Sequence, residues 1–293
     1  MTSESILFPH LHITLSHVGK TVSLFGIDVA YYGIVISIGM VLAGAFVLVL
    51  AHKNGKNEDD FLDILIWGLI FGVIGARIYY VIFRWDLYKD NLLSIFQLRQ
   101  GGLAIYGGII GGTIAAIVVC RIKKMNFFDA ADFICFGLLI GQIFGRWGNF
   151  FNREAFGTYT DSLFAMQIPL QAVRSTDDVT MEMLLHMKTI DGIPFISVHP
   201  TFLYESLWNL GIFIFLVLYH RHRKFNGELF FWYLMLYGLG RFWIESLRTD
   251  QLQFGSSGVA VSQVVAAVLV VVSAVYLLYH YRKFLQKKRN NQA

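Results

Sequence analysis

A run of charged, amide and glycine residues ends an apolar stretch in the middle of the chain. It reads Gly145-Arg-Trp-Gly-Asn-Phe-Phe-Asn-Arg-Glu-Ala-Phe-Gly157. A charged side chain near hydrocarbon costs a few kcal/mol, up to about 3 at the helix centre, so such residues usually line a polar cavity with a function. A stop-transfer arginine at the lipid headgroups explains Arg146, but it explains the amides, the acid and the glycine that follow less well. The run therefore predicts a polar functional site.

A second charged run, Tyr237 to Asp250, closes another apolar stretch. Arg241 and Glu245 are four residues apart and face one side of a helix, so a self-neutralising ion pair is one interpretation. Arg248 follows at the membrane interface. Because Arg146 and Arg241 both end apolar stretches at the same membrane face, we expect them to converge on one anion.

The segment His199-Pro-Thr-Phe-Leu-Tyr-Glu205 begins a further apolar stretch. The spacing does not place His199 and Glu205 on one helical face, and no cysteine or second histidine accompanies them at ligand spacing, so we expect no metal. We interpret His199 as capping the start of the helix and bonding within a polar pocket. Glu205, about one turn into the membrane, needs a cationic partner or a proton.

Glycines are concentrated between Gly101 and Gly112, in the sequence GGLAIYGGIIGG. Glycine costs about 1 kcal/mol relative to alanine inside a helix, so this density predicts either close helix packing or backbone presented to a ligand. Tyr106 lies within the block. Arg77, near the outer end of the preceding stretch, has two interpretations, snorkelling to the interface or catalysis.

The elements that must position these residues are membrane helices. Hydrophobic residues make up 56% of the 293 and charged residues 15%, which excludes an ordinary soluble domain. The apolar runs are continuous, whereas strands of a membrane barrel alternate. Seven runs are long enough, or nearly so, to cross a bilayer as helices, at about 31–51, 61–83, 103–120, 129–145, 201–219, 227–246 and 259–280.

Lysine and arginine set the expected orientation of the helices. They are denser in the short segments that lie inside if the N-terminus is outside, so the positive-inside rule favours an outer N-terminus and a cytoplasmic C-terminus. We expect one polytopic membrane domain over 1–293, with a small extracytoplasmic head at about 146–200. Within the head, Met181 to Met187 fits a short amphipathic helix, packed on the head or lying at the interface.

Charge and cysteine content exclude several further classes. The net charge of +4 and the basic tail at 282–289 indicate an anchor beside anionic lipid rather than a nucleic-acid partner. No cleavable signal is apparent, because the first basic residue is Lys20 and no positive segment precedes an early apolar core. Cys120 and Cys135 both lie in apolar runs, which predicts packing residues rather than a disulfide.

Five blocks of the sequence, in order, resemble those of bacterial prolipoprotein diacylglyceryl transferases. They are AYYG at 30–33, GGLAIYGG at 101–108, GRWGNFFNREAFG at 145–157, HPTFLYE at 199–205 and YGLGRFWIESLR at 237–248. Five ordered blocks are specific where one alone is weak. The resemblance implies a cofactor-independent, multi-pass enzyme of the bacterial cell membrane, and we expect a monomer. Such an enzyme moves the diacylglyceryl group of phosphatidylglycerol onto the lipobox cysteine of a prolipoprotein signal peptide and releases glycerol 1-phosphate.

Arginine suits this chemistry because its guanidinium makes bidentate, permanently charged contacts with phosphate. By resemblance, Arg146 and Arg241 stabilise the phosphate and the leaving group, Glu154 orients Arg146, and Tyr106 is a third catalytic residue. The residues that the resemblance implies for binding phosphatidylglycerol are Arg146, Asn149, Tyr32, Tyr237, Gly107, Gly108, Glu154, Gly157, His199, Glu245 and Arg248.

Tyr106 departs from the family pattern, because many members have a histidine there that is proposed to activate the thiol. A tyrosine has a pKa of about 10 and a cysteine of about 8.5, so neutral Tyr106 is a poor base near pH 7. We expect Tyr106 to orient the substrate while the arginines stabilise the thiolate.

Two other classes of membrane protein share some of these sequence features. A transporter of an anionic substrate also places arginines and glycine-rich helices at depth, but it usually has inverted repeats and charge at the midplane. Here no repeat recurs and the charges gather near the outer face. A scaffold protein would tolerate loss of the arginines, whereas a transferase would not.

Overall fold

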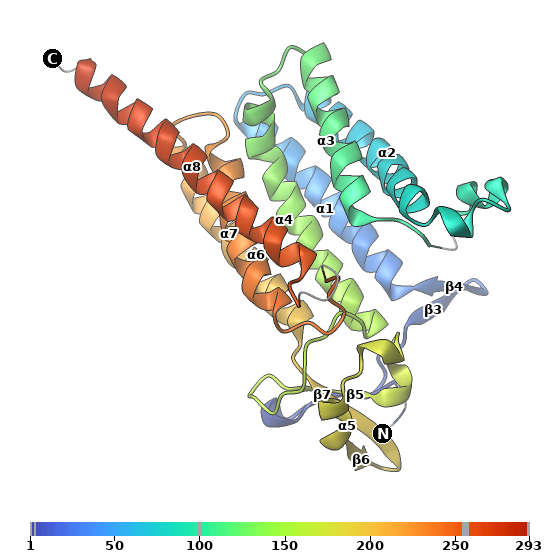
Figure 1. Ribbon diagram of the computed structural model, residues 1–293. Helices are drawn as coiled ribbons and strands as arrows, with labels where there is room; N and C mark the ends of the chain where they lie inside the picture. The colour runs from blue at the N-terminus through green and yellow to red at the C-terminus, as the bar shows by residue number, and fades with distance from the viewer. Residues whose placement is uncertain (1, 3, 99–100, 254–257, 292–293) are drawn as a thin grey trace. The chain divides into compact units, whose positions relative to one another are not determined.

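The computed structural model describes residues 2, 4–98, 101–253 and 258–291. The chain is mostly helical (Figure 1). It divides into two compact units. One unit comprises residues 1–43 and 135–293, and the other comprises residues 44–134.

Each of the seven predicted apolar runs forms a helix. The helices are α1 (Tyr31–Lys53), α2 (Glu58–Phe83), α3 (Ile105–Ile122), α4 (Phe127–Asn152), α6 (Thr201–Tyr219), α7 (Glu228–Glu245) and α8 (Val261–Asn290). Among the described residues, six helices are long and apolar enough to cross a membrane, and α7 is not one of them. The 18 residues of α7 include Glu228, Arg241 and Glu245, so this helix contains part of the charged site within its own length.

The larger unit contains a five-stranded antiparallel sheet that an all-helical prediction misses. Its strands are β1 (Ile6–Phe8), β2 (Ile13–Leu15), β5 (Met166–Pro169), β6 (Lys188–Ile190) and β7 (Ile193–Val198), in the order β2-β1-β5-β7-β6. The strands have three to six residues, too few for a clear alternation of apolar and polar residues. The predicted head therefore includes the N-terminal segment of the chain.

The predicted Met-rich helix exists as α5 (Met181–Leu185), with Thr180 as its N-cap. Met183 is fully buried in the core that also includes Ile6, Phe150 and Phe156. Of the two positions considered for this segment, packing on the head is therefore the one observed.

Arg153 links the N-terminal segment to the end of α4 by hydrogen bonds. Its guanidinium is buried and donates hydrogen bonds to the backbone carbonyls of Glu4, at 3.0 Å, and Val18. A hairpin of β3 (Thr21–Leu24) and β4 (Ile27–Ala30) then leads into α1, and its turn places Gly26 at a φ of 81°.

In the smaller unit, the glycine block of α3 packs against α2. A side chain on Gly107 would collide with the Gly75 carbonyl and the Tyr79 side chain, and one on Gly111 would collide with the Phe71 carbonyl. Close helix packing, one of the two interpretations of the block, therefore applies to Gly107 and Gly111. Cys120 is buried in this unit and Cys135 in the larger unit, and neither forms a disulfide, as predicted.

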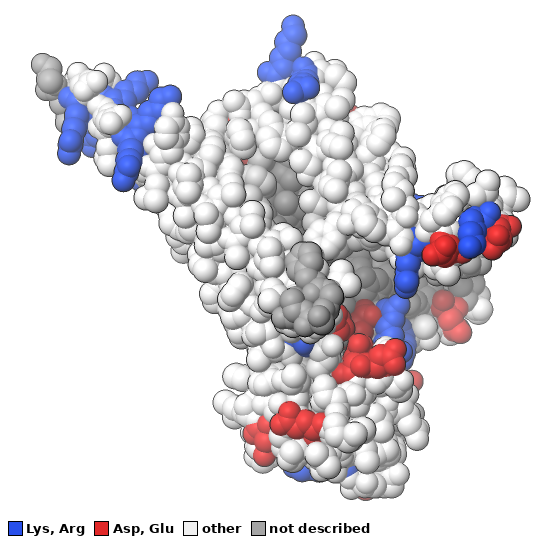
Figure 2. All heavy atoms as spheres, viewed as in Figure 1, with Lys and Arg blue, Asp and Glu red and all other residues white. Residues whose placement is uncertain are grey.

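Basic side chains gather at the C-terminal end of α8, whereas the remainder of α8 in the same view is uncharged (Figure 2). They belong to Arg282, Lys283, Lys287, Lys288 and Arg289. A helix that is apolar for most of its length and basic at its end matches a membrane helix anchored at an anionic surface.

Candidate functional site

The polar run after Gly145 is helical for most of its length. α4 continues to Asn152, so Arg146 and Asn149 lie about one turn apart on one helical face. The helix ends where Arg153, at a φ of 51°, adopts the left-handed conformation. Residues 146–152, which we expected to open the head, are instead the last two turns of α4.

Arg146 and Arg241 converge, and the anion between them is Glu205. Nη2 of Arg146 lies 2.6 Å from Oε1 of Glu205, and Nη1 of Arg241 lies 3.1 Å from Oε2. The Glu205 side chain is 3% exposed. Glu205 therefore has two cationic partners, Arg146 of α4 and Arg241 of α7.

The ion-pair network continues along the end of α7. Nη2 of Arg241 also pairs with Glu245, which confirms the predicted pair four residues apart. Arg248 donates from Nε and Nη2 to the two carboxylate oxygens of Asp250, at 2.9 and 2.7 Å, and its Nε lies 3.9 Å from Glu245. Burial is the largest single influence and would raise the pKa of Asp250, but the hydrogen bonds from Arg248 together with the charges of Arg248 and Arg241 outweigh it and lower the pKa.

Glu154 reaches Arg146 through an amide. Nη1 of Arg146 donates to Oδ1 of Asn149 at 3.3 Å, and Nδ2 of Asn149 donates to Oε1 of Glu154 at 3.0 Å. Asn152 donates to the same Glu154 oxygen at 3.0 Å, and Arg174 pairs with Oε2 at 2.5 Å. Sequence reasoning missed Arg174, because a single arginine in a long polar stretch has no spacing that singles it out.

Gly157 lies where the head meets the ends of two helices. Its N–H donates to the His199 carbonyl at 3.0 Å, and it pairs in a β-bridge with Arg248. A Cβ at this position would lie 2.8 Å from Cβ of His199 and 2.9 Å from the Leu247 carbonyl oxygen. The backbone there approaches its neighbours too closely for any other residue.

The predicted capping role of His199 is wrong. Pro200 occupies the N-cap of α6, and no side chain caps that helix. His199 instead continues the extended backbone of β7, because the residue before a proline disfavours the helical conformation. Nδ1 of His199 lies 3.3 Å from the hydroxyl of Tyr204, and burial lowers the pKa of His199.

Two of the predicted tyrosines border the arginine network. The ring of Tyr32 covers Gly148, where a Cβ would lie 2.7 Å from the ring. Tyr237 stacks on Tyr233 at 5.8 Å between ring centroids, one turn before Arg241 on α7, and the charge of Glu205 acts on its hydroxyl. Both positions are compatible with a pocket wall.

The other predicted residues belong to the smaller unit. Tyr106, Gly107 and Gly108 lie in the first turn of α3, and Gly107 is buried against α2. The structure therefore brings Arg146, Arg241 and Arg248 together with their carboxylate partners and with the head. Tyr106, Gly107 and Gly108 belong to the smaller unit instead. The roles predicted for Tyr106, Gly107 and Gly108 remain predictions.

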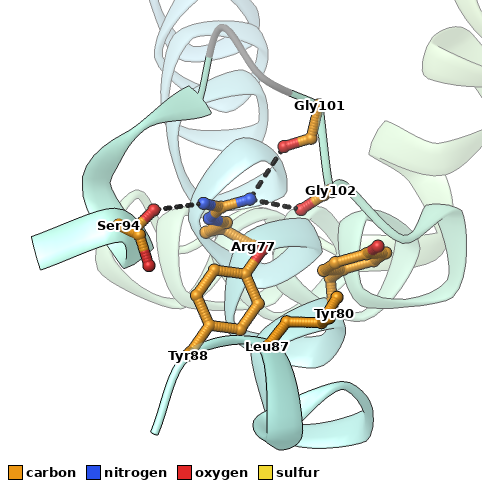
Figure 3. Close-up of a pocket in the computed structure, with 7 residues that line it drawn as sticks. All are labelled: Arg77, Tyr80, Leu87, Tyr88, Ser94, Gly101 and Gly102. Atoms are coloured by element: carbon orange, nitrogen blue, oxygen red, sulfur yellow. Dashed lines mark hydrogen bonds between the residues drawn. The ribbon is translucent and has the colours of Figure 1, made fainter. Parts of the chain in front are cut away.

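Arg77 has a structural role that neither interpretation included. Arg77 is 7% exposed, and its guanidinium donates four hydrogen bonds to backbone carbonyls at 2.7 to 2.9 Å. Those to Ser94, Gly101 and Gly102 are drawn in Figure 3. The carbonyls belong to Ser94, Ile95, Gly101 and Gly102, and the Tyr88 ring lies 5.1 Å away in a pocket of about 230 Å³. Arg77 therefore anchors the connection between α2 and α3.

The arginine network can hold an anion with permanently charged donors. Within the described residues, no three His, Cys, Asp or Glu side chains are grouped so as to hold a metal ion. Three arginines and three carboxylates alternate instead, on α4, α6, α7 and the segment after α7, in the order Arg146, Glu205, Arg241, Glu245, Arg248 and Asp250.

Comparison with known proteins identifies the family. The family model described as prolipoprotein diacylglyceryl transferase matches residues 20–279. A phosphatidylglycerol–prolipoprotein diacylglyceryl transferase of Finegoldia magna is 42% identical over 90% of this chain and 96% of its own length. Proteins of the same name from Clostridioides difficile and Staphylococcus aureus are each 40% identical, over 92% and 88% of this chain and 96% and 87% of their own lengths. The chain belongs to the prolipoprotein diacylglyceryl transferase family.

Proposed function

We propose that this protein transfers the diacylglyceryl group of phosphatidylglycerol to the lipobox cysteine thiol of prolipoproteins and releases glycerol 1-phosphate. The observation that supports it best is the convergence of Arg146 and Arg241 on one buried carboxylate. Two guanidinium groups held this close to a single anion form a preorganised site for a phosphate.

The chemistry needs such a site because the bond that breaks joins a glycerol carbon to a phosphate oxygen. As the thiolate attacks that carbon, negative charge grows on the departing phosphate. Donors fixed before the reaction stabilise this charge without the cost of reorganising. Arg146 and Arg241 provide the donors, and Asn149 and Glu154 hold Arg146 in place.

The other site residues support the same substrate. Glu245 and Arg248 hold Arg241, and Gly157 keeps the backbone of the head against the ends of α6 and α7. Tyr32, Tyr237 and His199 line the lipid headgroup pocket. Tyr106, with Gly107 and Gly108, orients the substrate.

The proposed arrangement in the membrane places the site at the outer face. All seven long helices span the bilayer, the N-terminus and the head at about 146–200 lie outside, and the basic end of α8 lies in the cytoplasm. The protein acts in the bacterial cell membrane as a monomer on lipobox-containing signal peptides. The six apolar helices and the basic tail support this arrangement.

A reconstituted transfer reaction tests the function. Purified protein is incubated with a lipobox peptide and either phosphatidylglycerol or a diacylglycerol that lacks the phosphate, and thioether-linked lipid is measured on the peptide by mass spectrometry. The proposal predicts transfer from phosphatidylglycerol only, with one glycerol 1-phosphate released per lipidated peptide. Absence of transfer by folded protein, or equal transfer from diacylglycerol, would refute it.

A further inference from the structure

Arg174 connects the head to a relay of polar side chains that ends at Arg146. Its Nη1 lies 2.5 Å from Oε2 of Glu154. Oε1 of Glu154 accepts a hydrogen bond from Asn149, and Asn149 in turn accepts one from Arg146. Three contacts therefore lead from an arginine of the head to a guanidinium of the proposed phosphate site.

The core of the head fixes the backbone of Arg174 beside the end of α4. The preceding residue, Val173, is buried in the same core as Phe150 of α4. The N–H of Arg174 donates to the carbonyl of Arg153, just after α4, at 3.3 Å. The Arg174 side chain is 61% exposed, but it starts from a backbone that is held against the helix that bears Arg146.

Arg174 completes the orientation of the Glu154 carboxylate. Oε1 of Glu154 accepts from the side-chain amides of Asn149 and Asn152, both at 3.0 Å. Two donors on one oxygen do not fix the position of the other oxygen. Arg174 holds this second oxygen, so the plane of the carboxylate is set by α4 from one side and by the head from the other.

The orientation of Glu154 decides which way the Asn149 amide points. A side-chain amide has a donor nitrogen and an acceptor oxygen. Because Nδ2 of Asn149 donates to Glu154, its Oδ1 is presented to Nη1 of Arg146, 3.3 Å away. The reversed amide would place its oxygen against the carboxylate and its nitrogen against the guanidinium, and neither contact would be a hydrogen bond. Glu154 thus orients the amide, and the amide orients one terminal nitrogen of Arg146.

We propose that Arg174 is a positioning residue for Arg146, a role that rests on the transferase function proposed above. Arg174 acts through Glu154 and Asn149 and does not touch the substrate. It leaves the charge of Arg146 unchanged and sets the direction in which Arg146 donates. Donors that are fixed before the reaction stabilise the charge on a departing phosphate without a cost of reorganisation. The head thereby contributes to the chemistry at the membrane helices.

The first test is Arg174→Met, which keeps an unbranched side chain and removes its donors. We expect kcat to fall about 10-fold, less than the roughly 10²-fold that a misplacement of 1 Å can cost, while the KM for phosphatidylglycerol stays within about threefold. The melting temperature in detergent should not change, because exposed ion pairs contribute little to stability.

Two further variants show whether the donor to Glu154 is what matters. Arg174→Lys restores one charged donor to Oε2 of Glu154, so it should return kcat to within about threefold of the wild-type value. Lys188→Met also removes one positive charge from an exposed position of the head, on β6, and is the matched control. Lys188→Met should behave as wild type.

A double-mutant cycle with Glu154→Gln tests the route of the effect. If Arg174 acts only through this carboxylate, Arg174→Met changes kcat by less than about twofold once residue 154 is glutamine. An effect of Arg174→Met as large as in the wild-type background would overturn the proposal. A raised KM with an unchanged kcat would also overturn it, because that pattern indicates direct binding of the lipid.

Failure of this proposal can be told apart from failure of the proposed function. If wild-type protein transfers lipid and Arg174→Met has the wild-type kcat, the positioning role fails and the function stands. An Arg174→Met protein that loses its cooperative melt, or an Arg174→Lys protein that is as slow as Arg174→Met, would likewise overturn the positioning role. Folded wild-type protein that transfers no lipid would refute the function and the positioning role together.

Discussion

At the scale of single residues, the site is a series of alternating positive and negative side chains. Almost every polar group in it forms an ion pair or a hydrogen bond with a neighbouring side chain. Arg146 is fixed from two sides, by Glu205 and through Asn149 by Glu154. Arg241 is fixed by Glu205 and Glu245. Removing one member of a buried pair leaves an uncompensated charge that costs about 3 to 5 kcal/mol. Conservative exchanges that preserve charge or shape are therefore the informative ones.

The half-buried His199 makes stability depend on pH. Burial lowers its pKa in the folded protein, so the unfolded chain binds the proton more readily. Stability from this group is present above the unfolded value of about 6.5 and is lost as the pH falls below it. We expect the melting temperature in detergent to fall from pH 7 to pH 5 more for wild type than for His199→Asn. His17→Asn, at an exposed position, should retain the wild-type dependence, and equal slopes for His199→Asn and wild type would contradict this account.

At the scale of elements, the long helices could be predicted from sequence because each is a continuous apolar run of about the length of a bilayer. The small strands of the head could not. β1 and β5 are separated by more than 150 residues, and the two strands pair at one position, where Leu7 lies opposite Gln167. Neither periodicity nor composition of a three-residue strand indicates a partner that distant.

The same contrast applies to the candidate site. Arg146 and Arg241 could be identified because charge at the end of an apolar run is costly. Their shared partner Glu205 could only be assigned a need for a cation, since the sequence does not fix how α6 is rotated against α4 and α7. Arg174 of the head was not identified at all. Contacts between elements depend on packing, which no local pattern specifies.

The connection between α2 and α3 depends on Arg77. Lysine has a single terminal nitrogen instead of the planar guanidinium group of arginine. The Arg77→Lys side chain therefore cannot donate to all four backbone carbonyls that Arg77 contacts. Each hydrogen bond from a charged group contributes about 1.5 to 3 kcal/mol. We therefore expect chymotrypsin to cleave within residues 84–98 at least about 10-fold faster in the variant. Arg84→Lys, at an exposed position, is the control, and an unchanged cleavage rate in Arg77→Lys would show that the anchor is dispensable.

At the scale of the whole molecule, the division of polar and apolar residues follows the two solvents that the protein meets. The long helices expose large apolar side chains, as helices that span a bilayer do, for example Val271 at 62% and Leu278 at 60% on α8. A network of alternating charges lies where α4, α6 and α7 meet the head. The phosphate-binding site that we propose at that boundary suits a substrate whose acyl chains remain in the bilayer while its headgroup is cleaved off.

Arg146 and Arg241 together stabilise the departing phosphate in the function that we propose. The most direct measurement is the single-turnover rate of diacylglyceryl transfer by wild type, by Arg146→Ala with Arg241→Ala, and by the paired lysine variant, each checked for a cooperative melt in detergent. Removing one preorganised donor typically costs about 10² to 10³ in rate. We expect the rate to fall at least about 10³-fold for the alanine pair and to be intermediate for the lysine pair, which keeps the charge but lacks the planar guanidinium group. A folded alanine pair that transfers within about 10-fold of the wild-type rate would contradict it.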